Sequence, residues 1–85
     1  MATYHDHLTT AAGLRDRILS GATNETPVRA WAAVCRECAF ANEKARAALA
    51  DNAAPVHPSK AFLNSLQQLW WFAKAQHEAL ARRAA

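Results

Sequence analysis

This sequence predicts an all-α fold, and three features support that class. The chain has 85 residues, 52% hydrophobic and 20% charged, so it carries enough apolar side chains for one folded domain. Only two Gly and three Pro interrupt it, and Ala, the strongest helix former, is frequent. Apolar residues recur every three or four positions, as on one helix face. We predict a single three-helix domain, 1–85, built on a long antiparallel hairpin of the second and third helices, with a shorter N-terminal helix.

The first helix is expected at about 9–20. Thr9 or Thr10 can serve as its N-cap, because a hydroxyl oxygen can accept a hydrogen bond from a free backbone N–H of the first turn. Gly21 suits the position after the helix, where the left-handed backbone conformation costs Gly little. The expected apolar face consists of Leu8, Ala11, Leu14 and Ile18, extended by Tyr4 if the helix begins earlier.

The second helix is expected at about 27–51. Thr26 followed by Pro27 is a typical start signal, since Pro is well accommodated at the first helical position. Asn42 falls within the apolar stripe, where it either fixes the packing register or marks the edge of the stripe. The stripe itself comprises Val28, Trp31, Val34, Cys35, Cys38, Ala45 and Leu49.

The third helix is expected at about 59–83, with Ser59 as its N-cap. Its first part, 61–73, contains no charged residue, Gly or Pro. Because the linker to the second helix is short, the two helices should fold back on each other. The apolar stripe comprises Phe62, Leu63, Leu66, Leu69, Trp70 and Ala73, and continues through His77, Leu80 and Ala84.

Three aromatic residues do not fit these stripes. Trp71 lies about 100° from Trp70 around the third helix and Phe72 about 200°, and Phe40 lies off the stripe of the second helix. Either the third helix is packed on several sides within one monomer, or Phe40, Trp71 and Phe72 form a contact with another chain. We favour the second explanation and expect a two-fold homodimer through this surface.

The function that these features predict is protein binding without catalysis, as in an adaptor, regulator or inhibitor. No Gly-rich phosphate loop, H-E-x-x-H or G-x-S-x-G motif occurs, so an enzyme is not expected. In size and composition the chain resembles small helical accessory proteins of bacteria and phages, which include inhibitors that occupy a partner's surface.

A metal site is the first alternative, because Cys35 and Cys38 form a C-x-x-C pair. Zinc would need further ligands, which His5 with His7, His57 or His77 could supply. Without metal, both Cys are expected to be buried free thiols, and His5 and His7 to be solvated. We expect no cofactor.

Nucleic-acid binding is a further alternative, since the net charge of +3 is concentrated late in the chain. Residues 52–85 hold four cations against the single acid Glu78, but nucleic-acid domains usually carry a denser basic patch. The first ten residues lack the apolar core of a signal peptide, and no segment provides the roughly 20 apolar residues of a membrane span. We therefore expect a cytoplasmic protein without a membrane partner.

Overall fold

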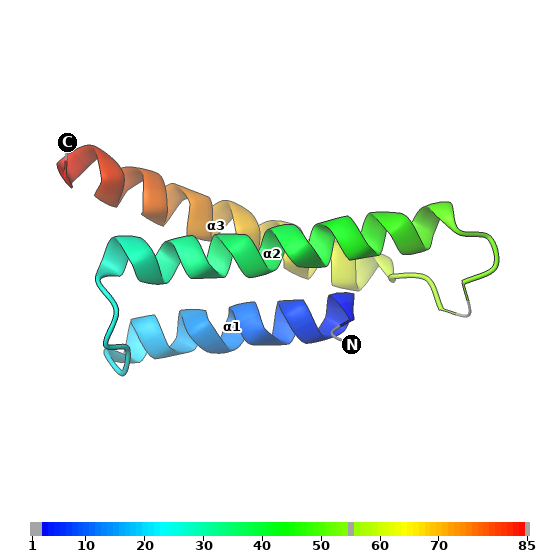
Figure 1. The fold of residues 1–85 in the computed structure, drawn as a ribbon, viewed down its shortest axis with the longest axis horizontal. Coiled ribbons are helices and arrows are strands. Elements are labelled where there is room, and N and C mark those ends of the chain that lie inside the picture. Colours follow the sequence, from blue (N-terminus) through cyan, green and yellow to red (C-terminus); the bar gives the residue numbers. More distant parts are fainter. Residues whose placement is uncertain (1–2, 55, 85) are drawn as a thin grey trace.

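The computed structural model describes residues 3–54 and 56–84, and this part of the chain forms three α-helices and no strand (Figure 1). The all-α class is therefore confirmed. The helices are α1, Tyr4–Ser20, α2, Pro27–Ala50, and α3, Lys60–Ala84. Each helix runs antiparallel to the one before it. The predicted stripe position of Ala84 lies outside the described side chains.

α2 is the central helix, because it packs against both α1 and α3 while those two helices hardly touch each other. The α2–α3 hairpin is present, but the contact between α1 and α2 is more extensive. The hairpin that the sequence predicts is therefore only part of the architecture. α3 crosses behind α2, and its C-terminal end diverges from it, which gives an elongated molecule of 45 × 23 × 21 Å (Figure 1).

α1 begins at Tyr4 and not near Thr9, because a capping box stabilises its first turn. The Thr3 hydroxyl accepts a hydrogen bond from the Asp6 backbone N–H at 3.2 Å, and the Asp6 carboxylate accepts one from the Thr3 N–H at 2.9 Å. The second bond holds the pKa of the Asp6 carboxyl below its ordinary value. Thr9 and Thr10, the predicted caps, lie exposed within the helix.

The remaining helix ends mostly follow the sequence signals. Gly21 adopts φ 76°, the left-handed conformation predicted for it, and donates its N–H to carbonyls of the last turn of α1. The Ser59 hydroxyl accepts a hydrogen bond from the Phe62 N–H at 3.0 Å, as a helix cap does. Thr26 occupies the N-cap position of α2, but its hydroxyl makes no capping hydrogen bond; Pro27 follows it in the first turn.

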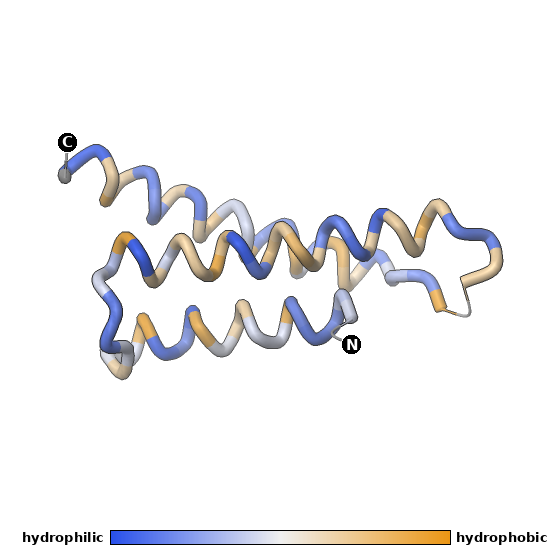
Figure 2. Tube along the Cα trace, in the orientation of Figure 1, coloured by the Kyte–Doolittle hydropathy of each residue, from blue (hydrophilic) through white to orange (hydrophobic). Residues whose placement is uncertain are grey.

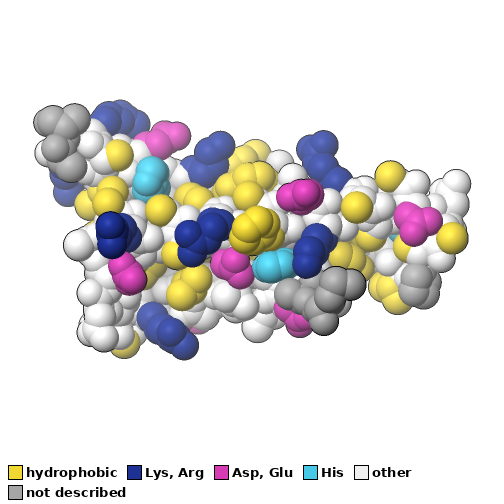
Figure 3. Space-filling model, in the orientation of Figure 1, with side chains coloured by type: hydrophobic (Ala, Val, Ile, Leu, Met, Phe, Trp, Pro, Cys, Tyr) yellow, Lys and Arg dark blue, Asp and Glu magenta, His cyan; other side chains and the backbone are white. Residues whose placement is uncertain are grey.

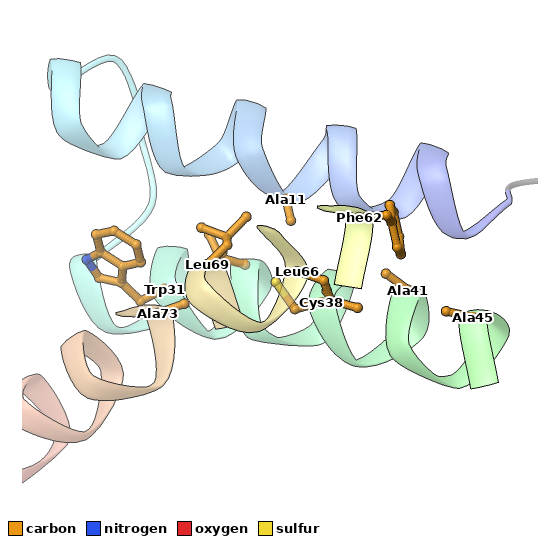
Figure 4. Close-up of a cluster of buried hydrophobic side chains, with 10 residues drawn as sticks. Ala11, Trp31, Cys38, Ala41, Ala45, Phe62, Leu66, Leu69 and Ala73 are labelled. Atoms are coloured by element: carbon orange, nitrogen blue, oxygen red, sulfur yellow. The ribbon is translucent and has the colours of Figure 1, made fainter. Parts of the chain in front are cut away.

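One hydrophobic core joins the three helices (Figure 4). α1 contributes Ala11 to it, and Phe62 of α3 points toward the first turn of α1, where Tyr4 meets it ring to ring at 5.0 Å. Figure 2 shows that apolar positions recur along each helix at helical spacing. The other members are Trp31, Val34, Cys38, Ala41 and Ala45 from α2, and Leu66, Leu69 and Ala73 from α3.

The predicted stripe of α2 is wrong at its last member. Leu49 is 47% exposed, because α2 extends past the start of α1 and its final turn lacks that neighbour (Figure 1). Asn42 is half-buried and lies outside the core, so it marks an edge of the stripe. None of the described helices is long and apolar enough to cross a membrane.

Replacing Leu66 with Ala should lower the free energy of unfolding by roughly 2–5 kcal/mol, because the side chain is buried in the hydrophobic core and a cavity would replace it. Urea unfolding followed by circular dichroism measures this. Leu19→Ala is the matched control, since Leu19 is 64% exposed and should change stability little. An equal cost at both positions would contradict the core described above.

Replacing Thr3 with Ala should cost about 1 kcal/mol of stability, because it removes the hydroxyl that accepts the Asp6 N–H. Thr9→Ala should instead be neutral or slightly stabilising, since Ala is the better helix former at an exposed interior position. Unfolding curves of both variants test this. The reverse order of stabilities would mean that α1 begins near Thr9 in solution.

Candidate functional site

An open groove lies between the second half of α2 and the first half of α3. Its volume is about 740 Å³, within the range of ligand-binding clefts. We call it the α2–α3 groove, and no described residue of α1 lines it. The lining residues are Asn42, Arg46, Leu49 and Ala50 from α2, and Leu63, Leu66, Gln67, Trp70 and Trp71 from α3.

The groove follows from the antiparallel register of the two helices. Leu49 and Leu63 are equidistant in sequence from Val56 in the linker, and both line the groove. Each wall runs over eight residue steps, 42–50 and 63–71, or about 12 Å at 1.5 Å per residue. The groove is therefore about two helical turns long. Buried Leu66 forms its floor, and exposed Leu49 and Trp71 lie at its edges.

The two adjacent Trp residues have different environments. Trp70 is half-buried, and the Lys74 ammonium lies 5.8 Å from the centroid of its ring, at the distance of a cation–π contact. Trp71 is 63% exposed. Most of the Trp71 ring surface is therefore accessible to solvent at the border of the groove.

Phe72, the second predicted interface residue, does not line the groove. Its ring contacts Trp31 of α2 edge to face, with centroids 5.4 Å apart and an interplanar angle of 76°. This geometry is favourable for aromatic pairs. Phe72 is still 43% exposed, so its inner edge supports the α2–α3 contact and its outer edge faces solvent.

Phe40, the third predicted interface residue, lies at the α1–α2 contact. Its ring centroid is 5.4 Å from that of His7 in α1. His7 Nδ1 donates a hydrogen bond to Glu37 Oε1 at 3.2 Å, and both side chains are largely buried. The expectation that His7 is solvated is therefore wrong, because α1 begins early enough to place it against α2.

Of the three predicted interface residues, only Trp71 lines the groove. Trp71 and Phe72 point about 100° apart around α3, and no described ring contact joins either of them to Phe40. Sequence reasoning missed Arg46, Leu49 and Leu63 as site residues. The hairpin register could have indicated them, because residues equidistant from the linker face each other.

Positive charge lies within the groove and next to it. Arg46 is the one ionisable residue of the lining, and Lys74 lies over the ring of Trp70 on α3. Glu43 is on the second half of α2 and Asp51 directly follows this helix, but neither lines the groove. Among the described side chains, none pairs with Arg46. On the face shown in Figure 3, apolar side chains lie along the length of the molecule, and charged ones lie between them.

The C-x-x-C pair lies within α2. Cys38 is fully buried and Cys35 half-buried, and both are free thiols. Burial raises the pKa of the Cys38 thiol to about 12, and the nearby Cys35 and Glu37 add to this. Burial also raises the pKa of the Cys35 thiol, although the Lys74 ammonium opposes the shift. Both environments disfavour the reactive thiolate.

Two of the remaining histidines proposed as zinc ligands make other contacts. The His5 ring contacts Tyr4 and Phe62 at 4.8 Å each. His57 Nε2 donates to the Asp51 carbonyl oxygen at 3.0 Å, and His77 is half-buried. In the part of the chain that the structure describes, no three His, Cys, Asp or Glu side chains are grouped so as to hold a metal ion.

Comparison with known proteins gives no match to a family model, a curated protein or a solved structure. The groove is therefore the feature of this protein that bears on its function. What the groove offers is apolar area, two side-chain amides and one guanidinium. These groups bind other molecules by burial and hydrogen bonding.

Thiol labelling at neutral pH should separate the two cysteines. With Cys38→Ala, the remaining Cys35 should react with maleimide slowly but measurably, because it is half-buried. With Cys35→Ser, the remaining Cys38 should react only as fast as the protein opens, since it is fully buried and its pKa is about 12. Mass spectrometry of the adducts measures both rates, and equal native-state rates would contradict the burial of Cys38.

Proposed function

We propose that this protein is a non-catalytic binding protein that holds an amphipathic helix of another protein in the α2–α3 groove. One observation carries the proposal: Trp71 is 63% exposed at the edge of a recess whose floor is apolar. Tryptophan is enriched among the residues that dominate binding energy at protein interfaces. Lodging an apolar helix face in such a groove is a common mode of peptide recognition.

The dimensions of the groove suit a short helix. Apolar residues at i, i+3 or i+4, and i+7 span about 10.5 Å along a helix axis, and the groove is about 12 Å long. A helix seated there would pack against α2 and α3 together, with Leu66 beneath it and Leu49 and Trp71 on either side. It would thus bury the apolar edges that the three helices leave in water.

The total surface of the chain supports the presence of a binding face. The accessible surface is 5877 Å² for a mass of 9.3 kDa, whereas a folded monomer of this mass typically exposes about 5,000 Å². The excess of about 900 Å² is close to the roughly 800 Å² that each partner buries in a standard interface. The elongated shape and the exposed apolar side chains account for it.

Self-association is the second candidate function for the same surface. The excess area favours a homodimer as much as a complex with another protein, because area does not identify the occupant. Light scattering over a range of concentrations distinguishes the two. A dimer that Trp71→Ala dissociates would establish self-association through the groove.

Trp71→Ala should strongly weaken binding at the groove while leaving the fold intact. The probe is a helical peptide of about 15 residues. It carries Leu at i, i+3 and i+7 and Gln elsewhere on the bound face. Its affinity, measured by fluorescence anisotropy, should fall about 30-fold or more, as for loss of a Trp anchor worth about 2 kcal/mol. Circular dichroism should show unchanged helicity, since Trp71 is mostly exposed.

Two matched aromatic variants serve as controls. Phe40→Ala should leave peptide binding unchanged, because Phe40 contacts His7 and not the groove. Phe72→Ala should lower stability by removing the ring that packs on Trp31, but not the affinity of the folded protein. If either control lost peptide binding while Trp71→Ala retained it, the binding face would lie elsewhere. If the wild type did not bind the peptide, the proposed function would be refuted.

A further inference from the structure

We infer that the helix held in the α2–α3 groove is acidic, with Asp or Glu on both flanks of its apolar face. This inference rests on the proposed function and specifies the partner's chemistry. Two cations carry the inference: Arg46 lines the groove on α2, and Lys74 lies over the ring of Trp70, a lining residue of α3. The lining itself contains no carboxylate.

Arg46 is available for a partner. It lines the groove from the exposed side of α2, and no described acid lies within ion-pair distance of its guanidinium. A guanidinium presents paired N–H donors that match the two oxygens of a carboxylate. The amides of Asn42 and Gln67 line the same groove and can hydrogen-bond to the polar flank of the incoming helix.

Lys74 provides a second positive charge on α3, one helical turn beyond Trp70, which lines the groove. Its ammonium is held over the Trp70 ring, 5.8 Å from the centroid, so its position is restricted next to the groove. A helix seated between the two cations would place one polar flank near each of them. Acidic residues on both flanks would therefore be attracted, and basic residues would be repelled from both sides.

The charge of the chain disfavours a second copy as the occupant. The net charge is +3, so two copies repel each other at long range. The excess lies in the same part of the chain as α3, since residues 52–85 hold Lys60, Lys74, Arg82 and Arg83 against Glu78. A nucleic acid is also disfavoured, because two cations at the groove are sparse compared with the basic stripes that bind phosphate backbones.

Three versions of the helical peptide test the inference, with Glu, Lys or Gln on both flanks of the same apolar face. At low salt the wild-type protein should bind the Glu peptide roughly tenfold more tightly than the Lys peptide. The difference should shrink as salt approaches about 1 M, where the Debye length is only about 3 Å. Arg46→Glu should remove or reverse the preference.

Arg36→Glu is the matched control, because Arg36 is exposed on α2 and does not line the groove. This substitution changes the net charge by the same amount as Arg46→Glu. It should keep most of the preference for Glu. Equal effects of the two variants would mean that net charge, not the groove, selects the peptide, and would overturn the inference. Equal affinity of the wild type for all three peptides would also overturn the inference. In that case, binding of the Gln peptide would still support the proposed function.

Two further outcomes would replace the acidic helix with another occupant. A wild-type dimer that Trp71→Ala dissociates would show that a second copy fills the groove. The protein could instead bind single-stranded oligo-dT more tightly than the Glu peptide and lose this binding in Trp71→Ala. That result would show that the groove binds single-stranded nucleic acid, with its aromatic rings stacked on bases. Failure of every peptide to bind in a Trp71-dependent manner would refute the proposed function together with the inference.

Discussion

The close approach of α2 to two neighbours at once is the constraint on which the rest of the structure depends. Ala41 and Ala45 are fully buried on its inner face, where larger side chains would push α1 and α3 away. Alanine buries little area, so large side chains from the flanking helices provide most of the apolar burial there. Phe62 does this between α1 and α3, and Leu66 and Leu69 do it along α2.

The same arrangement leaves one side of the α2–α3 pair open. α1 lies along α2 and has few contacts with α3, among them the ring contact of Tyr4 with Phe62, so it covers one flank of the hairpin. The groove lies between α2 and α3, and no described residue of α1 lines it. Exposed Trp71 and Arg46, for which no described acid is an ion-pair partner, both border this uncovered side of the hairpin.

Most of the fold could be predicted from the sequence because its signals are local. Gly21 and Ser59 act at the helix ends where they stand, and the apolar stripes identified nearly all of the core. The early start of α1 was missed, although Thr3 and Asp6 have the spacing of a capping box. The candidate site was harder to predict. The angular positions of residues around a single helix identified Trp71 as lying off the apolar stripe. They could not show that Phe40 and Phe72 contact other helices.

The order of the helices also bears on how quickly the chain reaches its native state. Each helix packs mainly on the next one in sequence, and the sparse contact between α1 and α3 requires little closure of long loops. Chains whose contacts are this local typically fold within microseconds to milliseconds. The groove is lined by α2 and α3 alone among the described residues, so its walls come together when the connection between these two helices closes.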